Sequence, residues 1–358
     1  MIRKWFLYPE SPGALALLGG LFAAVAVGLT ALGNPASSGL CASCFLVNVA
    51  GALHLHPRAT QSYLRPELLG IVLGAFFAAF SSREFRVRGG GGSSGVLHFV
   101  GGAFILLGCE VFIGCPIKAL LRTAGGGGAG LVGLLGLAGG VAFATLFLRD
   151  GYGFRPKAAV PEAAGLILPG AAFLLLLAVS MGSDLFAAAG FGGGAHHAPF
   201  AVSAAAGIFF GAAGQRSRFC VTGSIKSAVL ARDFREGAGT VTFLVVALLL
   251  NVLLGSFLPS VALEPGAHTD LYWAFLAMAM AGFGAILIAG CPFRQLVLAA
   301  SGDMDAAAAV AGMLLAASLS VAFNIGSSPA GVTDAGKIAV LAGWVFFLAL
   351  GIGCRKAA

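Results

Sequence analysis

Long apolar segments follow one another along almost the whole chain, and they restrict its fold more than any other feature. Hydrophobic residues make up 59% of the 358 positions and charged residues only 10%. A helix needs roughly 20 mostly apolar residues to cross a bilayer, where it satisfies its own backbone hydrogen bonds. The sequence therefore predicts an all-α polytopic membrane protein with about ten spans, centred on 13–32, 66–81, 96–113, 128–148, 163–182, 198–214, 237–257, 271–290, 306–323 and 337–354.

The basic residues predict which way these spans run. The chain carries 21 lysines and arginines against 14 acidic residues, a net charge of +7. Cytoplasmic loops of membrane proteins are enriched in lysine and arginine. With both termini in the cytoplasm, only Arg58, Arg65, Lys118, Arg122 and Lys337 are left outside. The inner side then receives Arg3, Lys4, Arg83, Arg86, Arg88, Arg149, Arg155, Lys157, Arg216, Arg218, Lys226, Arg232, Arg235, Arg294, Arg355 and Lys356.

Two cysteine motifs occur in the same order in each half of the chain. "SSGLCASC" and a later "GCP" are followed by "RSRFCVTG" and a second "GCP". Cys41 precedes Cys115 by 74 positions, and Cys220 precedes Cys291 by 71. If Cys44 is the counterpart of Cys220, both spacings are 71. The pairing of "GLC" with "RFC" favours Cys41, but spacing leaves the choice open.

The duplicated motifs predict two five-span repeats. Because five is odd, the second copy enters the membrane inverted relative to the first. Such repeats place a substrate site near the bilayer midplane, between the halves. We expect the first repeat in 1–160 and the second in 161–358, with the span at 163–182 at their junction. Unrelated helices with chance cysteines are the alternative.

Proline directly after cysteine indicates a broken helix at each "GCP" motif. Proline suits the first helical position, so Cys115 and Cys291 should be N-caps. The tails "PIKALLR" and "PFRQLVL" are too short to span the membrane, and we expect four short re-entrant half-helices lining a cavity. A helix N-terminus attracts an anion and lowers a thiol's pKa. Candidate binding and translocation residues are Cys41, Cys44, Cys115, Cys220 and Cys291.

Other charged residues extend this candidate site. Glu110 is an ionisable group in an apolar span, five positions before Cys115, and fits a proton acceptor or gate. Its alternative role is a carboxyl bonded to a neighbouring helix end. Basic side chains at the mouths would concentrate anions or, alternatively, snorkel at helix ends; they are Lys118, Arg122, Arg216, Arg218 and Arg294. We expect Cys109 and Cys354 to serve packing.

Cys41 and Cys44 also form a C-x-x-C pair, which can be a redox dithiol or half of a zinc site. The second repeat has Thr222 and Gly223 near the equivalent place, and no histidine falls near either motif. We therefore expect no metal and no other cofactor.

At "GLCASC", "GQRSRFCVTG" and the two "GCP" sites, nearly the whole chain resembles the YeeE/YedE family of bacterial inner-membrane proteins. "GNPASSGLCASCF" and "YLRPELLGIVLGAF" look closer to its YedE branch, which is associated with selenium transport. The resemblance implies an hourglass of inverted halves in which Cys41, Cys115, Cys220 and Cys291 contact thiosulfate. Cys44 and the Cys109–Glu110 pair depart from the thiosulfate pattern, so a selenium compound or another reduced sulfur species is also possible.

We thus expect a transporter, not an enzyme, for a small anion containing sulfur or selenium in the bacterial inner membrane. The family suggests a soluble sulfur-carrier partner on the cytoplasmic side, and nucleic acid is not an expected partner. A membrane thiol-redox or sulfurtransferase-type enzyme using the C-x-x-C pair is the main alternative. A scaffold subunit of another membrane complex is the third.

Overall fold

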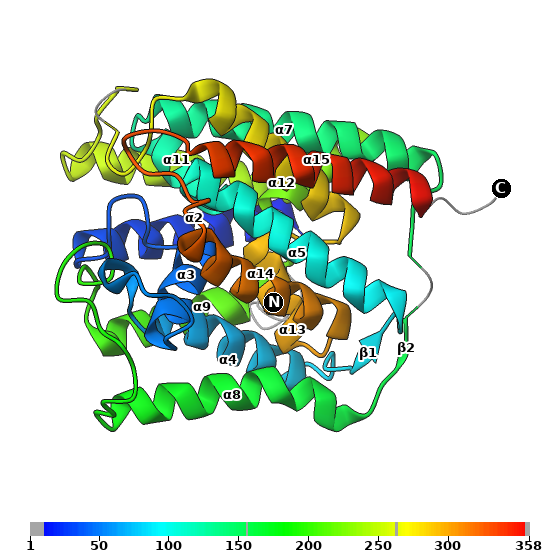
Figure 1. Ribbon diagram of the computed structural model, residues 1–358, viewed down its shortest axis with the longest axis horizontal. Coiled ribbons are helices and arrows are strands. Elements are labelled where there is room, and N and C mark those ends of the chain that lie inside the picture. Colours follow the sequence, from blue (N-terminus) through cyan, green and yellow to red (C-terminus); the bar gives the residue numbers. More distant parts are fainter. Residues whose placement is uncertain (1–10, 155–156, 262–263, 355–358) are drawn as a thin grey trace.

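Helices make up nearly all of the regular structure (Figure 1). The computed structural model describes residues 11–154, 157–261 and 264–354. Its helices are α2 (Pro12–Ala31), α3 (Ala42–Ala52), α4 (Pro66–Ser81), α5 (Ser93–Phe112), α6 (Pro116–Ala124), α7 (Gly128–Arg149), α8 (Glu162–Ser180), α9 (Phe200–Ser217), α10 (Val221–Ala231), α11 (Arg235–Leu253), α12 (Leu271–Leu287), α13 (Pro292–Ala300), α14 (Met304–Ala322) and α15 (Asp334–Gly353). A 3-10 turn, η1 (Ala59–Gln61), and two short strands, β1 (Arg88–Gly89) and β2 (Ala158–Ala159), complete it.

Eight helical segments in the described residues are long and apolar enough to cross a membrane. Two of them, Ser93–Ala124 and Leu271–Ala300, each contain the break before a "GCP" helix. The prediction of an all-α polytopic membrane protein is confirmed at this level. Two of the ten expected spans, 66–81 and 198–214, form α4 and α9, which do not meet the same combined requirement for length and hydropathy.

The helices follow each other in two series of seven with similar lengths, α2 to α8 and α9 to α15. The second member of each series has 11 residues (α3, α10), and the fifth has nine (α6, α13). The series exchange partners, because α4 packs along α9 while α11 packs along α2. In the same way α5 packs along α14 and α12 along α7. The two halves are therefore packed into each other rather than standing as separate lobes.

Glycines allow these helix pairs to approach closely. A Cβ at Gly140 of α7 would overlap the Ala279 carbonyl of α12, and one at Gly74 of α4 would overlap the Ile208 carbonyl of α9. Small residues at such contacts let helix backbones meet inside a membrane, where packing drives association. The glycine content of the chain is therefore part of its helix packing.

The last member of each series breaks this correspondence. Helix α15 packs against α5 and α12, whereas α8 packs against α4 and α13. Figure 1 shows α8 along one edge of the bundle and α15 near the opposite edge. Only 17% of the membrane-spanning stretch of α8 is buried, against 33% of that of α15.

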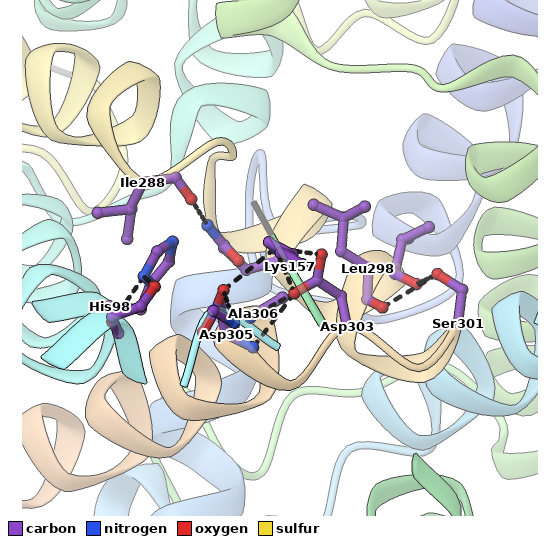
Figure 2. Close-up of polar contacts among 12 residues, drawn as sticks. His98, Lys157, Ile288, Leu298, Ser301, Asp303, Asp305 and Ala306 are labelled. Carbon is purple, nitrogen blue, oxygen red and sulfur yellow. Dashed lines mark hydrogen bonds and ion pairs between the residues drawn. The ribbon is translucent and has the colours of Figure 1, made fainter. Parts of the chain in front are cut away.

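A polar cluster ties the connection between α7 and α8 to the first turn of α14 (Figure 2). Asp303 caps α14 by accepting from the backbone N–H groups of Asp305 and Ala306, both at 3.2 Å. Lys157 Nζ lies 2.6 Å from both carboxylate oxygens of Asp303 and 3.4 Å from Asp305 Oδ2. The antiparallel pair of β1 and β2 lies beside it. We call this end of the bundle the strand end, and the C-terminal end of α15 also lies there (Figure 1).

Several residues used to predict the topology cannot be placed. Arg3, Lys4, Arg155, Arg355 and Lys356, all expected in the cytoplasm, lie outside the described residues.

Candidate functional site

All four motif cysteines are N-caps of short helices, which we call the thiol-capped helices. Cys41 precedes α3, Cys115 precedes α6, Cys220 precedes α10 and Cys291 precedes α13. Pro116 and Pro292 occupy the first helical positions, where a missing N–H costs nothing. The prediction that Cys115 and Cys291 are N-caps is confirmed. The backbone N–H groups of the first turns have no helical carbonyl to bond, so each start is electropositive.

The local geometry decides which cysteine matches Cys220. The sulfur atom of Cys41 accepts from the Cys44 N–H at 3.4 Å, and that of Cys220 accepts from the Gly223 N–H at the same distance. Each sulfur atom also lies beside the hydroxyl two residues on, at 3.5 Å for Ser43 and 3.1 Å for Thr222. Cys41 is therefore the structural counterpart of Cys220, and Cys44 stands where the second series has Gly223.

In the second series two of the thiols meet. The sulfur atoms of Cys220 and Cys291 lie 3.8 Å apart. Aromatic packing holds the neighbouring backbone, because the Phe22 ring lies 4.9 Å from the Phe219 ring and 6.1 Å from the Phe293 ring. Two thiols this close provide a soft, polarisable surface with weak hydrogen-bond donors.

One of the three arginines expected on this side lies close to the thiol pair. Arg294, the third residue of α13, is half-buried, donates to the Gly214 carbonyl at 3.3 Å and interacts electrostatically with Cys220 and Cys291. Arg218 is exposed at the end of α9, two residues before Cys220. Arg216 is half-buried, 3.9 Å from Glu84. The structure therefore brings Arg294 to the thiols and places Arg216 near a carboxylate.

In the first series a cavity of about 290 Å³ lies beside the start of α3. We call it the polar cavity. Its lining includes Cys44, Asn48, Arg65, Glu110 and Lys118. Lys118 Nζ donates to Cys44 Sγ at 3.7 Å. Lys118 is the third residue of α6, as Arg294 is of α13, so each proline-started helix has a cation one turn inside its N-terminus. The cavity thus combines a sulfur atom, an ammonium and a carboxylate.

Cys41 and Cys44 are joined as a disulfide. Cys41 is fully buried, whereas Cys44 is half-buried and lines the polar cavity. The redox state of this pair therefore changes the chemistry of one wall of the cavity: a disulfide offers no S–H donor, while a dithiol offers two.

Arg122, which was expected near the outer mouth, is bonded to groups inside the protein. Arg122 is 1% exposed, donates to the carbonyls of Phe112 at 2.9 Å and Gly266 at 2.6 Å, and pairs with Glu264 at 3.3 Å. Its charge is largely balanced by Glu264, which differs from the expected role in attracting anions. Arg122 and Glu264 do line a neighbouring hollow of about 540 Å³.

Arg65 has a similar structural role at the polar cavity. It is 1% exposed and donates to Asn48 Oδ1 at 2.7 Å and to the carbonyls of Gly193 at 2.9 Å and His196 at 3.1 Å. These bonds fasten the connection between α8 and α9 across the cavity. Beside it, burial raises the pKa of Tyr63 to about 12, so its ring, stacked on His197, stays neutral.

Some polar residues near the site were missed by the sequence reasoning. Glu67 is fully buried near the start of α4 and accepts from Asn34 Nδ2 at 2.9 Å and Ser203 Oγ at 3.0 Å. Glu67 could have been identified from its position at the edge of an apolar run, by the argument that was applied to Glu110. Ser43 and Thr222 carried a weaker signal, since hydroxyls are common beside helix starts.

The remaining cysteines stand apart from the thiol-capped helices. Cys109 is buried within α5, and Cys354 ends α15. Among the described residues, no group of three or more histidine, cysteine or acidic side chains is arranged to hold a metal ion.

Comparison with models of known protein families gives no match, and comparison with curated protein sequences gives none either. The functional argument therefore depends on the residues themselves.

Proposed function

We propose that the protein transports a small anion containing sulfur or selenium across the bacterial inner membrane. The observation that carries this proposal is the position of four cysteines at the N-termini of four short helices. Helix N-termini stabilise anions, and thiols suit a soft sulfur or selenium atom better than hydroxyls do. A hydrophobic protein has little other reason to repeat this arrangement.

The path we propose runs between the two cation-bearing regions. An anion enters the polar cavity beside Lys118, passes the thiols of Cys115 and then of Cys291 and Cys220, and leaves past Arg294. The 3.8 Å distance between the sulfur atoms of Cys220 and Cys291 supports passage from one thiol to the next. Glu110 would act as a proton acceptor or as a gate at the entrance.

We further infer ten crossings in two inverted five-span repeats. The exchange of partners between the two helix series supports a pseudo-twofold relation. We propose that both termini are cytoplasmic and that the strand end faces the cytoplasm, because Arg83, Arg86, Arg88 and Lys157 fall in its connections and Arg149 ends α7 there. The motif resemblance favours the YeeE/YedE family, with thiosulfate or a selenium species as cargo and a cytoplasmic sulfur carrier as the receiving partner.

The proposal is tested by uptake of labelled thiosulfate and selenite into proteoliposomes. Cys291→Ala should reduce uptake at least about tenfold, because it removes a soft contact at a narrow point of the path. Cys354→Ala is the matched control and should transport normally. Cys291→Ser tests whether sulfur itself is required, because serine keeps a hydrogen-bonding cap. Retained uptake would show that such a cap is enough, and lost uptake would show that sulfur is needed. Undiminished uptake by both Cys291→Ala and Cys115→Ala would rule out the thiol path.

The Cys41–Cys44 disulfide supports a second candidate function, a membrane thiol-redox or sulfurtransferase-type enzyme. In that case a soluble thiol would attack Cys44 Sγ from the polar cavity, forming a mixed disulfide as the bond to Cys41 breaks and Cys41 leaves as a thiol. In the reduced pair, the Cys44 thiolate would instead take the outer sulfur of a persulfide donor, which leaves as a thiol. Mass spectrometry of protein incubated with such a donor tests this, with Cys44→Ser as the variant that should lose the adduct. Transport that proceeds unchanged in Cys44→Ser would leave only the first function.

A further inference from the structure

An entirely apolar cavity of about 380 Å³ lies between α8 and its neighbouring helices. We call it the apolar cavity. Its walls come from α3, α4, α8, α13 and α14, and none of the lining residues has a polar side chain. Water does not fill such a space, since it would find no hydrogen-bond partner there. The cavity therefore suits a hydrocarbon occupant.

The apolar cavity opens sideways, towards the surroundings of the bundle. Ile167 of α8 lines it and is 68% exposed, and Ala171 and Ala311 line it and are also exposed. The opening thus lies between α8 and α14. Because α8 is an apolar spanning helix with little burial, this side faces lipid. The equivalent helix of the other series, α15, packs instead against α5 and α12.

The length of the apolar cavity matches one leaflet of a bilayer. Its α8 wall runs from Ala164 to Leu175, about 16 Å along a helix at 1.5 Å per residue. One leaflet supplies about half of the roughly 30 Å hydrocarbon core. Ala164 lies at the strand end of α8, so the matching leaflet is the one on that side.

Two exposed cations flank Val87, whose side chain lies against Gly165 at the strand end of the apolar cavity. Gly165 lines the apolar cavity and leaves no room for a side chain beside Val87. Arg86 and Arg88, on either side of Val87, are exposed, and neither has an ion-pair partner among the described residues. Lys157 is engaged by Asp303, as Figure 2 shows. Glu162 is exposed nearby and opposes part of this positive charge.

We propose that an acyl chain of an anionic phospholipid occupies the apolar cavity, with its phosphate at Arg86 and Arg88. The acyl chain fills the apolar cavity and contacts its apolar walls. The two guanidinium groups favour a negatively charged headgroup. The lipid would stabilise the position of α8 against α4, α13 and α14. This inference does not depend on what the protein transports.

Native mass spectrometry of the purified, delipidated protein tests it after addition of phosphatidylglycerol or phosphatidylcholine. We expect one phosphatidylglycerol to stay bound to each chain at collision energies that strip the other lipids. Arg86→Gln and Arg88→Gln should each weaken retention about fivefold, since a basic residue near the surface contributes on that scale. Equal retention of both lipids by wild-type protein would overturn the headgroup assignment.

Ala171→Phe fills the opening and should abolish retention. Gly170→Phe is its matched control, because a Cβ at Gly170 meets no atom within 4 Å and Gly170 does not line the cavity. Loss in both variants, or in neither, would place the lipid on the outer surface and overturn the proposal. So would a lipid-free dimer that Ala171→Phe disrupts, because a second copy of the chain would then cover α8. Thermal unfolding without lipid shows whether each variant is folded.

Discussion

Single residues set the chemistry of both ends of the candidate path. Lys118 and Arg294 occupy the same place in α6 and α13, one turn after a cysteine and a proline. Their difference is informative, because a lysine is a compact point charge and an arginine is a planar fork of donors. Lys118 donates to the sulfur atom of Cys44 in the polar cavity. Arg294 instead donates to the Gly214 carbonyl and interacts electrostatically with Cys220 and Cys291. Along the proposed path, the two halves would thus present different cations to the same anion.

A buried histidine gives a pH dependence at the same scale. His268 lies in the connection between α11 and α12, with Nε2 2.8 Å from the Val111 carbonyl, and burial lowers its pKa below the ordinary 6.5. Arg122 also lowers this pKa, while Asp270 and Glu264 oppose the shift. As the pH falls below about 6.5, the unfolded chain binds a proton that the folded protein does not. Its stability should then fall by at most about 1.4 kcal/mol per pH unit.

Thermal unfolding in detergent between pH 7.5 and 5 measures this effect. His268→Gln keeps an N–H donor for the Val111 carbonyl and should show a flatter profile. A variant profile as steep as that of the wild type would assign the acid sensitivity to other groups.

At the scale of elements, two kinds of helix junction define the fold. The thiol-capped helices begin in the interior, where proline or a sulfur acceptor replaces the missing turn. The long helices meet through glycine contacts that bring backbones together. The first kind creates polar helix ends next to the thiols, and the second holds the surrounding helices close enough to keep those ends buried.

The contact between α7 and α12 provides a matched pair of variants. Gly140→Ala places a methyl group against the Ala279 carbonyl and should destabilise the protein by about 1–3 kcal/mol through overpacking. Gly139→Ala meets only the Phe275 ring at 3.8 Å and should be neutral or slightly stabilising, because alanine is the better helix former. Melting temperatures in detergent compare them, and equal values would show that this glycine contact does not limit packing.

For the whole molecule, the decisive feature is that two helix series are packed into each other. The connection from α7 to α8 belongs to the first series, and Lys157 fixes it to Asp303 at the start of α14, which belongs to the second (Figure 2). The partners come from opposite halves of the sequence. Their ion pair therefore bears on the relative position of the halves as well as on local structure.

Lys157→Met should lower the free energy of unfolding by about 1–3 kcal/mol, because Asp303 and Asp305 are buried and would lose their cation. Lys337→Met is the control, since its partner Asp334 is 91% exposed and such pairs contribute little. Chemical denaturation of both variants measures their free energies of unfolding. A Lys157→Met protein as stable as the control would mean that the cluster is dispensable.

The apolar segments and the two "GCP" motifs were enough to predict the class of fold and the places where helices break. Apolar runs of about 20 residues favour membrane helices, and proline favours the first position of a helix, so Cys115 and Cys291 were predicted as N-caps. Tertiary structure alone decided that Cys220 meets Cys291, that Glu264 balances Arg122 and that an apolar cavity remains between α8 and its neighbours. These outcomes depend on how helices far apart in the chain pack together. Local periodicity and residue preference do not predict that packing.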